Sequence, residues 1–387
     1  MSVAVGTIVA NNFLPFARVL AASLREHHPT VPFFTVLADR PDAACAPGLE
    51  PFEIVLLDDL GIPDLRSLCF GYSRQQVSIA VKPYLLDYLL GRGFASAIFL
   101  DADILVLDSL HPLFDAAAAH AICLTPHLVR PLSGIDRRVR DLNILQAGVY
   151  NGGFVGVSGR PPARQFLAWW VDRLRTHCRH DVAHGMHYDQ RWLDLVPALF
   201  DGVHIVRNPG CNVAYWNLGE RESSRTRFFH FSGFEPEHPQ TLTRYSNRLT
   251  METVGPETAA LFARYVERLR DEGYFEYRAR TYGFGAFDNG VPIPDVARRL
   301  YLEANGGPDR FGDPFAADGP GSYFRWLNEP VEGSSGTMTR LWHAVYRRRV
   351  DLQRAFPDVF GADGDAFRAW IGVSGVKEHG VADAFAR

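Results

Sequence analysis

Between residues 3 and 235 the chain alternates between short apolar runs and longer stretches with helical spacing. The runs are rich in β-branched residues, and turn-forming residues separate them from stretches whose apolar positions recur every three or four residues. This alternation is typical of an α/β domain in which a mostly parallel central sheet is flanked by helices. The expected strands are residues 3–10, 31–38, 52–57, 97–100, 149–157 and 203–207, and the expected helices are residues 15–25, 77–90 and 164–175.

The end of the chain has a different pattern. Residues 257–270 form an amphipathic stretch, glycine and proline then become frequent, and helical spacing returns in residues 336–354 and 363–371. We therefore predict an α/β domain at residues 1–250 and a mostly helical C-terminal extension at residues 251–387.

Composition places the chain among folded proteins that have no general attraction for nucleic acid. Its 387 residues, 47% of them apolar, allow a substantial core, and its formal net charge of -4 creates no field that attracts a phosphate backbone. The five cysteines are scattered and never spaced as CxxC, which argues against a disulfide framework or a zinc knuckle. The start, MSVAVGTIVANNF, lacks a basic signal region, and no apolar run reaches the roughly 18 residues of a membrane span. We expect a cytoplasmic protein, and peripheral contact with the inner face of the membrane stays open.

The most informative local feature is an acidic pair directly after the apolar run 97–100. Asp101 and Asp103 are separated by one residue and followed by a second apolar run, ILVL. Open α/β sheets bind ligands just beyond the carboxyl ends of their strands. Two carboxylates placed there can share a hard divalent cation that offsets charge on a diphosphate. The alternative is an acidic turn without a metal, and the apolar runs on both sides favour the metal site.

The segment FLDADILVLDSLHPLF resembles the metal-binding segment of glycosyltransferase family 8, which includes galactosyltransferases and glycogenin-like enzymes. The patterns NGG at Asn151, DQ at Asp189 and HxxG at His230 follow in the family's order. The resemblance covers residues 3–235. It implies the Rossmann-like GT-A fold and the metal-dependent transfer of a sugar from a nucleotide diphosphate sugar, most commonly a UDP-sugar, to a saccharide, lipid or protein acceptor.

The resemblance also assigns roles to individual residues. It makes His230 the third metal ligand beside Asp101 and Asp103, and an imidazole with two carboxylates favours Mn²⁺, with Mg²⁺ as the alternative. It makes Asp189 and Gln190 the catalytic pair, with the carbonyl of Gln190 opposite the leaving group, where it can stabilise positive charge. The residues it assigns to the donor sugar are Lys82, Asn151, Gly152, Gly153 and Asp189. Those it assigns to the nucleotide are Thr7, Ala10, Asn11, Asn12, Lys82, Ala102 and Gly233. Those it assigns to the acceptor side are Asn212 and Asn217.

Several of these residues also have a simpler structural interpretation. Lys82 could be a surface side chain lying along apolar neighbours, the glycine pair an ordinary turn, and Asp189 a helix cap. A histidine that follows two phenylalanines is most often a satisfied core residue. The chain also departs from the family twice. The acidic residue usual in the first loop is absent at Ala10, and no lysine follows the HxxG glycine, so Arg244 or Arg248 would have to supply that charge.

Other reaction types remain open at this point. The resemblance implies retention of anomeric configuration, with the departing phosphate taking the acceptor's proton; if a carboxylate such as Asp141 or Glu220 takes it, the reaction inverts. A sugar-1-phosphate nucleotidyltransferase would need a glycine-rich basic loop after the first strand, which IVANNFLPFA lacks. An inactive sugar-nucleotide-binding protein is a third interpretation, and the presence of all three expected ligands counts against it. Three roles stay open for the extension at residues 251–387: to bind the acceptor, to pair two copies as a homodimer, or only to enlarge the core.

Overall fold

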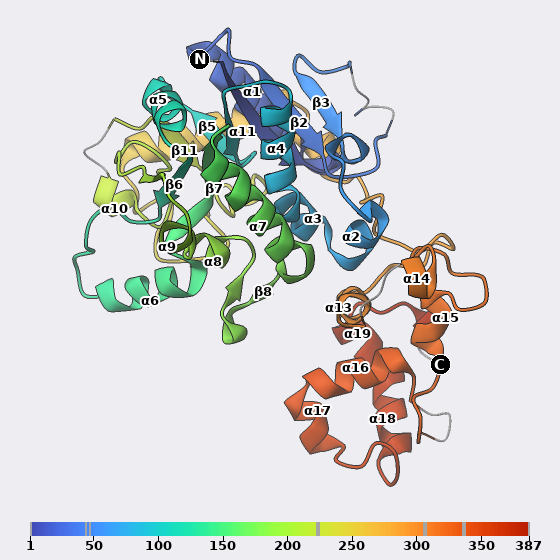
Figure 1. Ribbon diagram of the computed structural model, residues 1–387. Helices are drawn as coiled ribbons and strands as arrows, with labels where there is room; N and C mark the ends of the chain where they lie inside the picture. The colour runs from blue at the N-terminus through green and yellow to red at the C-terminus, as the bar shows by residue number, and fades with distance from the viewer. Residues whose placement is uncertain are drawn as a thin grey trace. The chain divides into compact units, whose positions relative to one another are not determined.

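The computed structural model describes residues 2–42, 45, 48–221, 225–304, 308–334 and 338–385. The described residues fall into two compact units (Figure 1). The first unit spans Met1–Gly61 and Ser78–Tyr282, and the second spans Ile62–Val77 and Gly283–Arg387.

Within the described residues, the first unit is built around a seven-stranded sheet with the strand order β10-β6-β7-β4-β1-β2-β3. Neighbouring strands are parallel except for β7, which runs antiparallel to both β4 and β6. The predicted mostly parallel α/β sheet is therefore confirmed. The strands are β1 Val3–Val9, β2 Phe33–Leu37, β3 Glu53–Leu56, β4 Ser96–Leu100, β6 Ile122–Pro126, β7 Tyr150–Ser158 and β10 Val203–Ile205.

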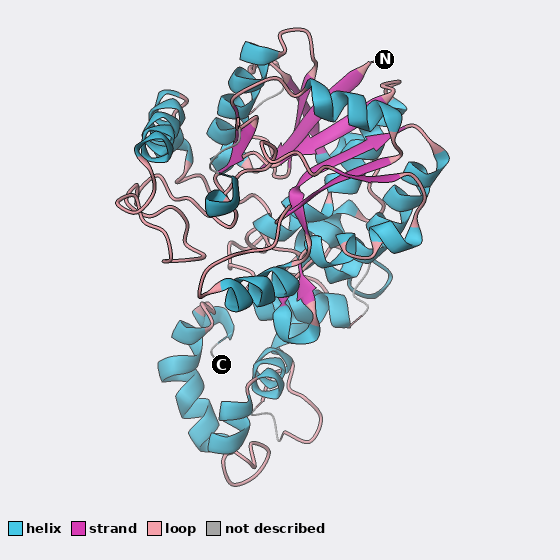
Figure 2. Cartoon of the chain, turned by 90° about the vertical axis from the view of Figure 1, so that its left-hand side faces the viewer, coloured by secondary structure: helices cyan, strands magenta, loops and turns pink. Residues whose placement is uncertain are grey.

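Helices cover both faces of this sheet (Figure 2). Side chains alternate between the faces along a strand, so neighbouring residues of β1 meet different helices. Gly6 faces Leu85 of α4, while Val5 packs into the core on the opposite face. The helices on the Gly6 face are α4 (Lys82–Gly91) and α7 (Pro161–His177), and those on the Val5 face are α1 (Leu14–His27) and α5 (His111–Ala119).

The helix predicted at residues 77–90 is in fact two helices. α3 (Arg74–Ala80) ends before Val81, and α4 begins at Lys82. Pro83 has no backbone N–H to donate to the carbonyl four residues earlier, so a continuous helix is broken there. The break leaves Lys82 at the first residue of α4.

The shorter elements of the first unit lie in its loops and around a small second sheet. Strand β11 pairs antiparallel with β5 in this small sheet. The elements are β5 Ile104–Val106, β8 His180–Asp181, β9 Met186–His187, β11 Phe228–His230, α6 Arg137–Ala147, α8 Gln190–Leu193, α9 Val196–Leu199, α10 Leu218–Arg221 and α12 Tyr274–Tyr277, with short 3₁₀ helices at Asn11–Phe13, Leu57–Leu60 and Val182–His184.

The division between the units differs from the predicted boundary at residue 250. Helix α11 (Pro256–Asp271) belongs to the first unit because its apolar face packs on Phe231, the residue directly after β11. The rings of Phe262 and Tyr265 lie with centroids 4.8 Å and 3.7 Å from that of Phe231. The role predicted for the C-terminal extension stays a prediction.

The second unit is mostly helical, as predicted for the C-terminal part. Its later residues are joined to the earlier segment around α2 (Leu65–Gly71) by Arg298. The buried side chain of Arg298 donates to the carbonyls of Phe70 at 2.7 Å and Tyr72 at 2.9 Å. The helices are α2 Leu65–Gly71, α13 Asp295–Glu303, α14 Pro308–Phe311, α15 Tyr323–Asn328, α16 Arg340–Arg348, α17 Val350–Ala355, α18 Gly364–Trp370 and α19 Val376–Glu378, together with the π-helix Ile371–Gly375 and the 3₁₀ helix Asp383–Phe385.

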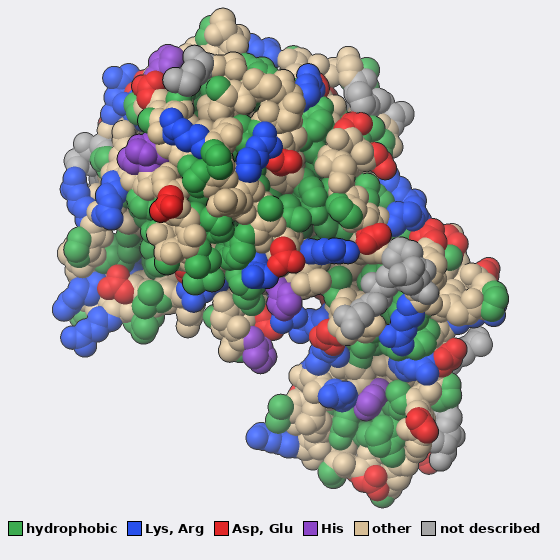
Figure 3. Space-filling view, in the orientation of Figure 1, with side chains coloured by type: hydrophobic (Ala, Val, Ile, Leu, Met, Phe, Trp, Pro, Cys, Tyr) green, Lys and Arg blue, Asp and Glu red, His purple; other side chains and the backbone are tan. Residues whose placement is uncertain are grey.

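The surface shows charges of both signs side by side. Figure 3 shows Lys and Arg side chains interspersed with Asp and Glu on the visible face, in keeping with the small net charge of -4. No helix in the part of the chain that the structure describes is long and apolar enough to cross a membrane.

Candidate active site

The candidate residues gather along one edge of the sheet, at the carboxyl ends of its parallel strands. Residues 11–12 follow β1, and Asp101 follows β4. Because β7 runs the opposite way, its first residues reach this same edge, and the N–H of Asp101 donates to the carbonyl of Gly153 at 2.9 Å. The reversed strand therefore places the NGG segment beside the acidic pair.

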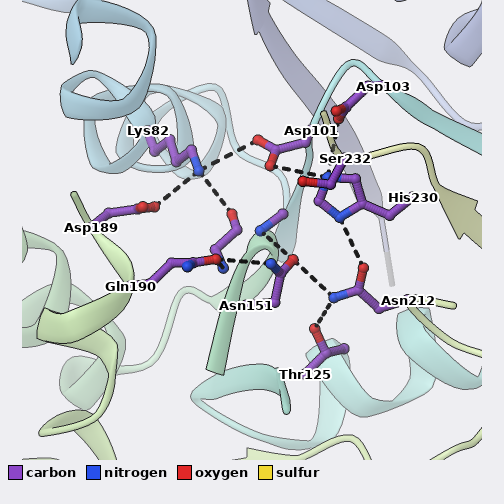
Figure 4. Close-up of polar contacts among 12 residues, drawn as sticks. Lys82, Asp101, Asp103, Thr125, Asn151, Asp189, Gln190, Asn212, His230 and Ser232 are labelled. Carbon is purple, nitrogen blue, oxygen red and sulfur yellow. Dashed lines mark hydrogen bonds and ion pairs between the residues drawn. The ribbon is translucent and has the colours of Figure 1, made fainter. Parts of the chain in front are cut away.

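Asp101, Asp103 and His230 converge into one cluster (Figure 4). Each offers one ligand atom, and these atoms all lie within 4.8 Å of one another. The Nε2 of His230 is 3.1 Å from Oδ1 of Asp103 and 3.7 Å from Oδ2 of Asp101. His230 reaches the aspartates because it ends β11, whose antiparallel partner β5 starts at Ile104, directly after Asp103. Two carboxylates and an imidazole at this spacing fit a divalent cation.

The cluster is buried at the histidine and open at the aspartates. The His230 side chain is 3% exposed, whereas those of Asp101 and Asp103 are 31% and 25% exposed. Burial opposes a charged His230, but the two carboxylates outweigh it and raise the pKa of the imidazole. Burial also opposes the ionised form of Asp103, yet the neighbouring His230 lowers its pKa; at Asp101 burial prevails and raises the pKa. A cation would take the place of the proton that the carboxylates favour on His230.

Lys82 is a buried cation at the centre of the site. Its Nζ donates to Oδ2 of Asp189 and to the carbonyl of Gly152, both at 2.9 Å, and lies 3.4 Å from Oδ1 of Asp101. Burial opposes its charge, but Asp101 and Asp189 raise its pKa. The side chain is therefore a paired interior charge and not a surface lysine. The carboxylate of Asp189 likewise binds Lys82 and makes no helix-capping hydrogen bond.

Gln190 faces Asn151 across the site. Its Oε1 accepts from Nδ2 of Asn151 at 2.8 Å and from the N–H of Gly152 at 3.1 Å, while its Nε2 donates to the carbonyl of Ala147 at 3.2 Å. The start of β7 and the end of α6 thus hold both ends of this amide. Its orientation is set by the protein itself.

The glycine pair of β7 is required by close packing and forms no turn. A Cβ added to Gly152 would lie 2.5 Å from Oδ2 of Asp189, and one added to Gly153 would lie 2.5 Å from Cε1 of His230. Any side chain at these positions would displace one of those two residues. The glycines therefore let the acid and the imidazole approach the same strand.

Asn212 holds His230 in place. It is fully buried, and its Oδ1 lies 3.1 Å from Nδ1 of His230 while its Nδ2 donates to Oγ1 of Thr125 at 2.9 Å and to Oδ1 of Asn151 at 3.0 Å. When a cation takes the place of the proton on Nε2, a ring that still donates from Nδ1 to Asn212 has the lone pair of Nε2 available to bind that cation. Asn217 is also buried and donates to the carbonyl of Asn212 at 3.1 Å. The acceptor contacts predicted for these two asparagines stay predictions.

We expect Asn212→Gly to weaken Mn²⁺ binding about 10–100-fold, because it removes the partner that orients a metal ligand. Glycine is chosen because Asn212 has a φ of 58°, which glycine adopts without strain. Titration calorimetry with Mn²⁺ measures the effect. Asn217→Ala, which loosens the same loop without touching His230, is the control and should bind Mn²⁺ more tightly than Asn212→Gly. Unchanged affinity in Asn212→Gly would show that Asn212 does not orient the ligand.

The residues assigned to the nucleotide lie at the end of β1 and around the acidic pair. Thr7, Ala10, Asn11, Asn12 and Ala102 are all buried. The Oγ1 of Thr7 and the Oδ1 atoms of both asparagines have no hydrogen-bond partner among the described residues. Buried acceptors without a partner are costly, so donors from a bound ligand would stabilise this end of the site.

The loop after His230 carries the two arginines considered as a source of positive charge, Arg244 and Arg248. The N–H of Arg244 donates to the carbonyl of Gly233 at 2.9 Å, and its guanidinium donates to the hydroxyl of Tyr245 at 3.0 Å. Arg248 donates to the carbonyl of Tyr215 at 3.3 Å. Gly233 has a φ of 69°, and a Cβ there would lie 2.5 Å from the Tyr245 ring, so this position needs glycine. Neither guanidinium contact involves the metal cluster.

The sequence patterns do not predict two polar residues at the end of β6. Thr125 accepts from Asn212, and Nε2 of His127 lies 3.2 Å from Nδ2 of Asn151. Burial lowers the pKa of His127 to about 3, so this imidazole is neutral. The sequence did contain a signal for them: the apolar run at residues 121–124 is followed by the polar residue Thr125, just as the run at residues 97–100 is followed by Asp101.

No family model matches the sequence. Among curated proteins, the chain is similar to two uncharacterized proteins of Bacillus subtilis (strain 168). YfnF is 23% identical over 251 residues, which cover 60% of this chain and 82% of the relative. YfnD is 25% identical over 202 residues, which cover 48% of this chain and 62% of the relative.

The chain is similar to two solved structures of glycosyltransferases. The galactosyltransferase LgtC in complex with donor and acceptor sugar analogs has a TM-score of 0.46 and 18% identity, covering 70% of this chain and 96% of LgtC. The glycosyltransferase GlyE of Streptococcus pneumoniae TIGR4 has a TM-score of 0.42 and 12% identity, covering 74% of this chain and 67% of GlyE. At these values the likeness does not say what this chain binds or transfers.

Proposed function

We propose that the protein is a metal-dependent glycosyltransferase of the GT-A type, which transfers a sugar from a UDP-sugar to a saccharide, lipid or protein acceptor. The observation that carries the proposal is the cluster of Asp101, Asp103 and His230 beside the buried pair of Lys82 and Asp189. A diphosphate needs positive charge, and a sugar needs several hydrogen-bonding groups. Both are present at one edge of the sheet.

Mn²⁺, or Mg²⁺ in its place, is the cation that we assign to Asp101, Asp103 and His230. When bound, it would act as a Lewis acid that offsets the charge developing on the departing diphosphate. Three protein ligands leave coordination positions for phosphate oxygens and water. The partly exposed aspartates leave the cluster accessible from one side.

Asp189 and Gln190 are the residues that we assign to catalysis. Lys82 holds the carboxylate of Asp189, which would then bind hydroxyls of the donor sugar together with Asn151 and the backbone of the glycine pair. The carbonyl of Gln190, held by Asn151 and Gly152, would stabilise positive charge at the reacting carbon. A carbonyl that is already oriented needs no reorganisation during the reaction.

The nucleotide is assigned to the end of β1. The unpartnered oxygens of Thr7, Asn11 and Asn12 would accept hydrogen bonds from the base and ribose, next to the backbone of Ala10. In the sequence, Ala102 lies between the two aspartates and Gly233 comes three residues after His230. Both would meet the diphosphate through their backbone. Uracil is proposed from the resemblance to family 8, in which UDP is the commonest nucleotide.

Retention of anomeric configuration is the stereochemistry that we propose. The two carboxylates considered as bases for inversion are placed unfavourably: Oε1 of Glu220 accepts from the N–H of Val129 at 2.8 Å, and Asp141 lies on the exposed surface of α6. The departing phosphate would then accept the proton of the acceptor. The second unit is proposed to bind the acceptor or to pair two copies, and a cytoplasmic location stays a prediction.

A thermal melt with UDP and Mn²⁺ tests the proposal. UDP at about 100 times its dissociation constant should stabilise the protein by about 2.7 kcal/mol. This corresponds to a rise in Tm of about 3–5 °C, because an unfolding entropy of about 2.1 cal/mol/K per residue gives about 1–2 °C per kcal/mol for a chain of this size. We expect the rise only when Mn²⁺ is present, and a weaker one with GDP. Equal protection without any divalent ion would contradict the assigned site.

A screen of nucleotide sugars for Mn²⁺-dependent release of free sugar then identifies the donor. Release from one UDP-sugar supports a transferase, whereas protection by UDP without any release would indicate a binding protein. If UTP protects far better than UDP, a nucleotidyltransferase becomes the better explanation.

A further inference from the structure

Helix α6 of the first unit presents a row of apolar side chains to solvent. All of its residues are described, and none is buried. Val139, Leu142 and Leu145 are spaced three residues apart, share one face, and are 61%, 57% and 56% exposed. Ile135, just before the helix, is fully exposed. Single exposed apolar residues are ordinary, but an amphipathic helix of a soluble protein normally turns such a row toward the core.

Polar contacts near both ends of α6 attach it to the unit. Arg140 donates to the carbonyl of Trp216 at 3.1 Å near the start of the helix. Near its end, Arg191 donates to the carbonyl of Leu145 at 2.6 Å, and Gln190 donates to that of Ala147 at 3.2 Å. The helix is therefore held firmly with its apolar row facing outward, and its last turn supports a residue of the candidate site.

Positive charge accompanies the apolar row. Arg137 and Arg138 are exposed on the first turn of α6. Arg140 lies near Arg248, whose pKa is lowered first by burial and then by the charge of Arg140. Two acids, Asp136 and Asp141, offset part of this charge. Figure 3 shows basic side chains next to hydrophobic ones over α6. The combination is that of a helix lying in the plane of a lipid surface, with arginines at the level of the phosphates.

The size of the surface favours a membrane over a second protein. A stable protein interface takes about 20–30 residues on each side, and three side chains on one helix with a fourth just before it fall well short of that. A few inserted apolar side chains together with basic residues are enough for reversible binding to anionic lipid.

We propose that α6 is a docking helix that holds the first unit on a bilayer surface carrying anionic lipid. Val139 and Leu142 enter the interface between head groups and acyl chains, and Arg137 and Arg138 meet lipid phosphates. A consequence, which rests on the proposed function, is that the site at Gln190 works next to the membrane and takes acceptors presented there. The docking itself needs no donor or metal.

Flotation of the full-length protein with phosphatidylcholine vesicles, with and without phosphatidylglycerol, tests the docking. We expect flotation only with phosphatidylglycerol, and loss of binding as salt is raised. Leu142→Asp should weaken binding about 10-fold or more, because a charge replaces an inserted side chain. The double variant Arg137→Glu and Arg138→Glu, which leaves the apolar row intact, should weaken it about 30-fold or more, since each basic residue contributes roughly fivefold.

The controls lie in the second unit. Val350 and Val373 are 59% and 69% exposed, and Val350→Asp and Val373→Asp should bind vesicles as the unchanged protein does. Unchanged protein that stays unbound with phosphatidylglycerol, or arginine variants that bind equally well, would overturn the docking. So would a dimer that Leu142→Asp converts to a monomer, because the row would then face a second copy. The UDP melt on the same variants is independent: retained protection together with lost flotation leaves the transferase proposal standing.

Discussion

Replacing Asp103 with asparagine is expected to lower Mn²⁺-dependent sugar transfer at least about 100-fold, because losing even an outer partner of a metal ligand costs about 10–100-fold. Asparagine keeps the shape of the side chain but removes the charge that binds the cation and that faces Nε2 of His230 at 3.1 Å. The measurements are kcat/KM with the donor found in the screen and Mn²⁺ affinity by titration calorimetry. Asp101→Asn should behave in the same way.

Asp172→Asn is the matched control. Asp172 is an exposed aspartate on α7 whose ion pair is with Arg173, its neighbour in the chain. This variant should transfer sugar and bind Mn²⁺ as the unchanged protein does. If Asp103→Asn retained both activities, the cluster at the end of β4 would not be the metal site, and the proposed function would lose its main support.

Replacing Lys82 with methionine is expected to reduce the free energy of unfolding by about 3–5 kcal/mol, the usual effect of removing one partner from a buried ion pair. Methionine keeps the length of the side chain, but it leaves the carboxylate of Asp189 buried without its cation, next to Asp101. Urea unfolding measures the loss. The double variant Lys82→Met with Asp189→Asn should recover part of it, because the unpaired charge is then removed.

The chain offers a close control for this experiment. Its sequence contains one other lysine, Lys377, which is exposed on α19 of the second unit. Lys377→Met should change the unfolding free energy by less than about 0.5 kcal/mol, as most surface substitutions do. A similarly small change for Lys82→Met would mean that the ion pair is not buried as the structure places it.

Much of the fold could be predicted from local patterns. The strands around residues 3–9 and 96–100 and the helix at residues 161–177 were predicted because apolar periodicity is a property of neighbouring residues. The break before Lys82 was missed, although Pro83 was its signal. The strand β6 was also missed, although its apolar run at residues 121–124 is as long as the run at residues 97–100 that was recognised.

The candidate site was predicted as a series of motifs in a given order along the chain. That these motifs lie close together in space depends on how the strands pair. Asp101 and Asp103 could be recognised from the sequence, because a wholly apolar strand that ends in two acids is unusual. The pairing of β5 with β11 brings His230 to them, and the reversed direction of β7 brings in the glycine pair. Asn212 was singled out only for the acceptor side, and its contact with His230 had no local signal because the two residues lie 18 positions apart in the chain.

By itself, the sequence determined the alternation of strands and helices and the acidic strand end, because both follow from side chains a few residues apart. Only the tertiary structure decided that Lys82 is buried between two carboxylates, that Asn212 holds the histidine, and that the apolar row of α6 faces outward. These features depend on packing between segments distant in the chain. The same amphipathic pattern serves a helix that faces the core and one that faces a membrane, and what surrounds the helix makes the difference.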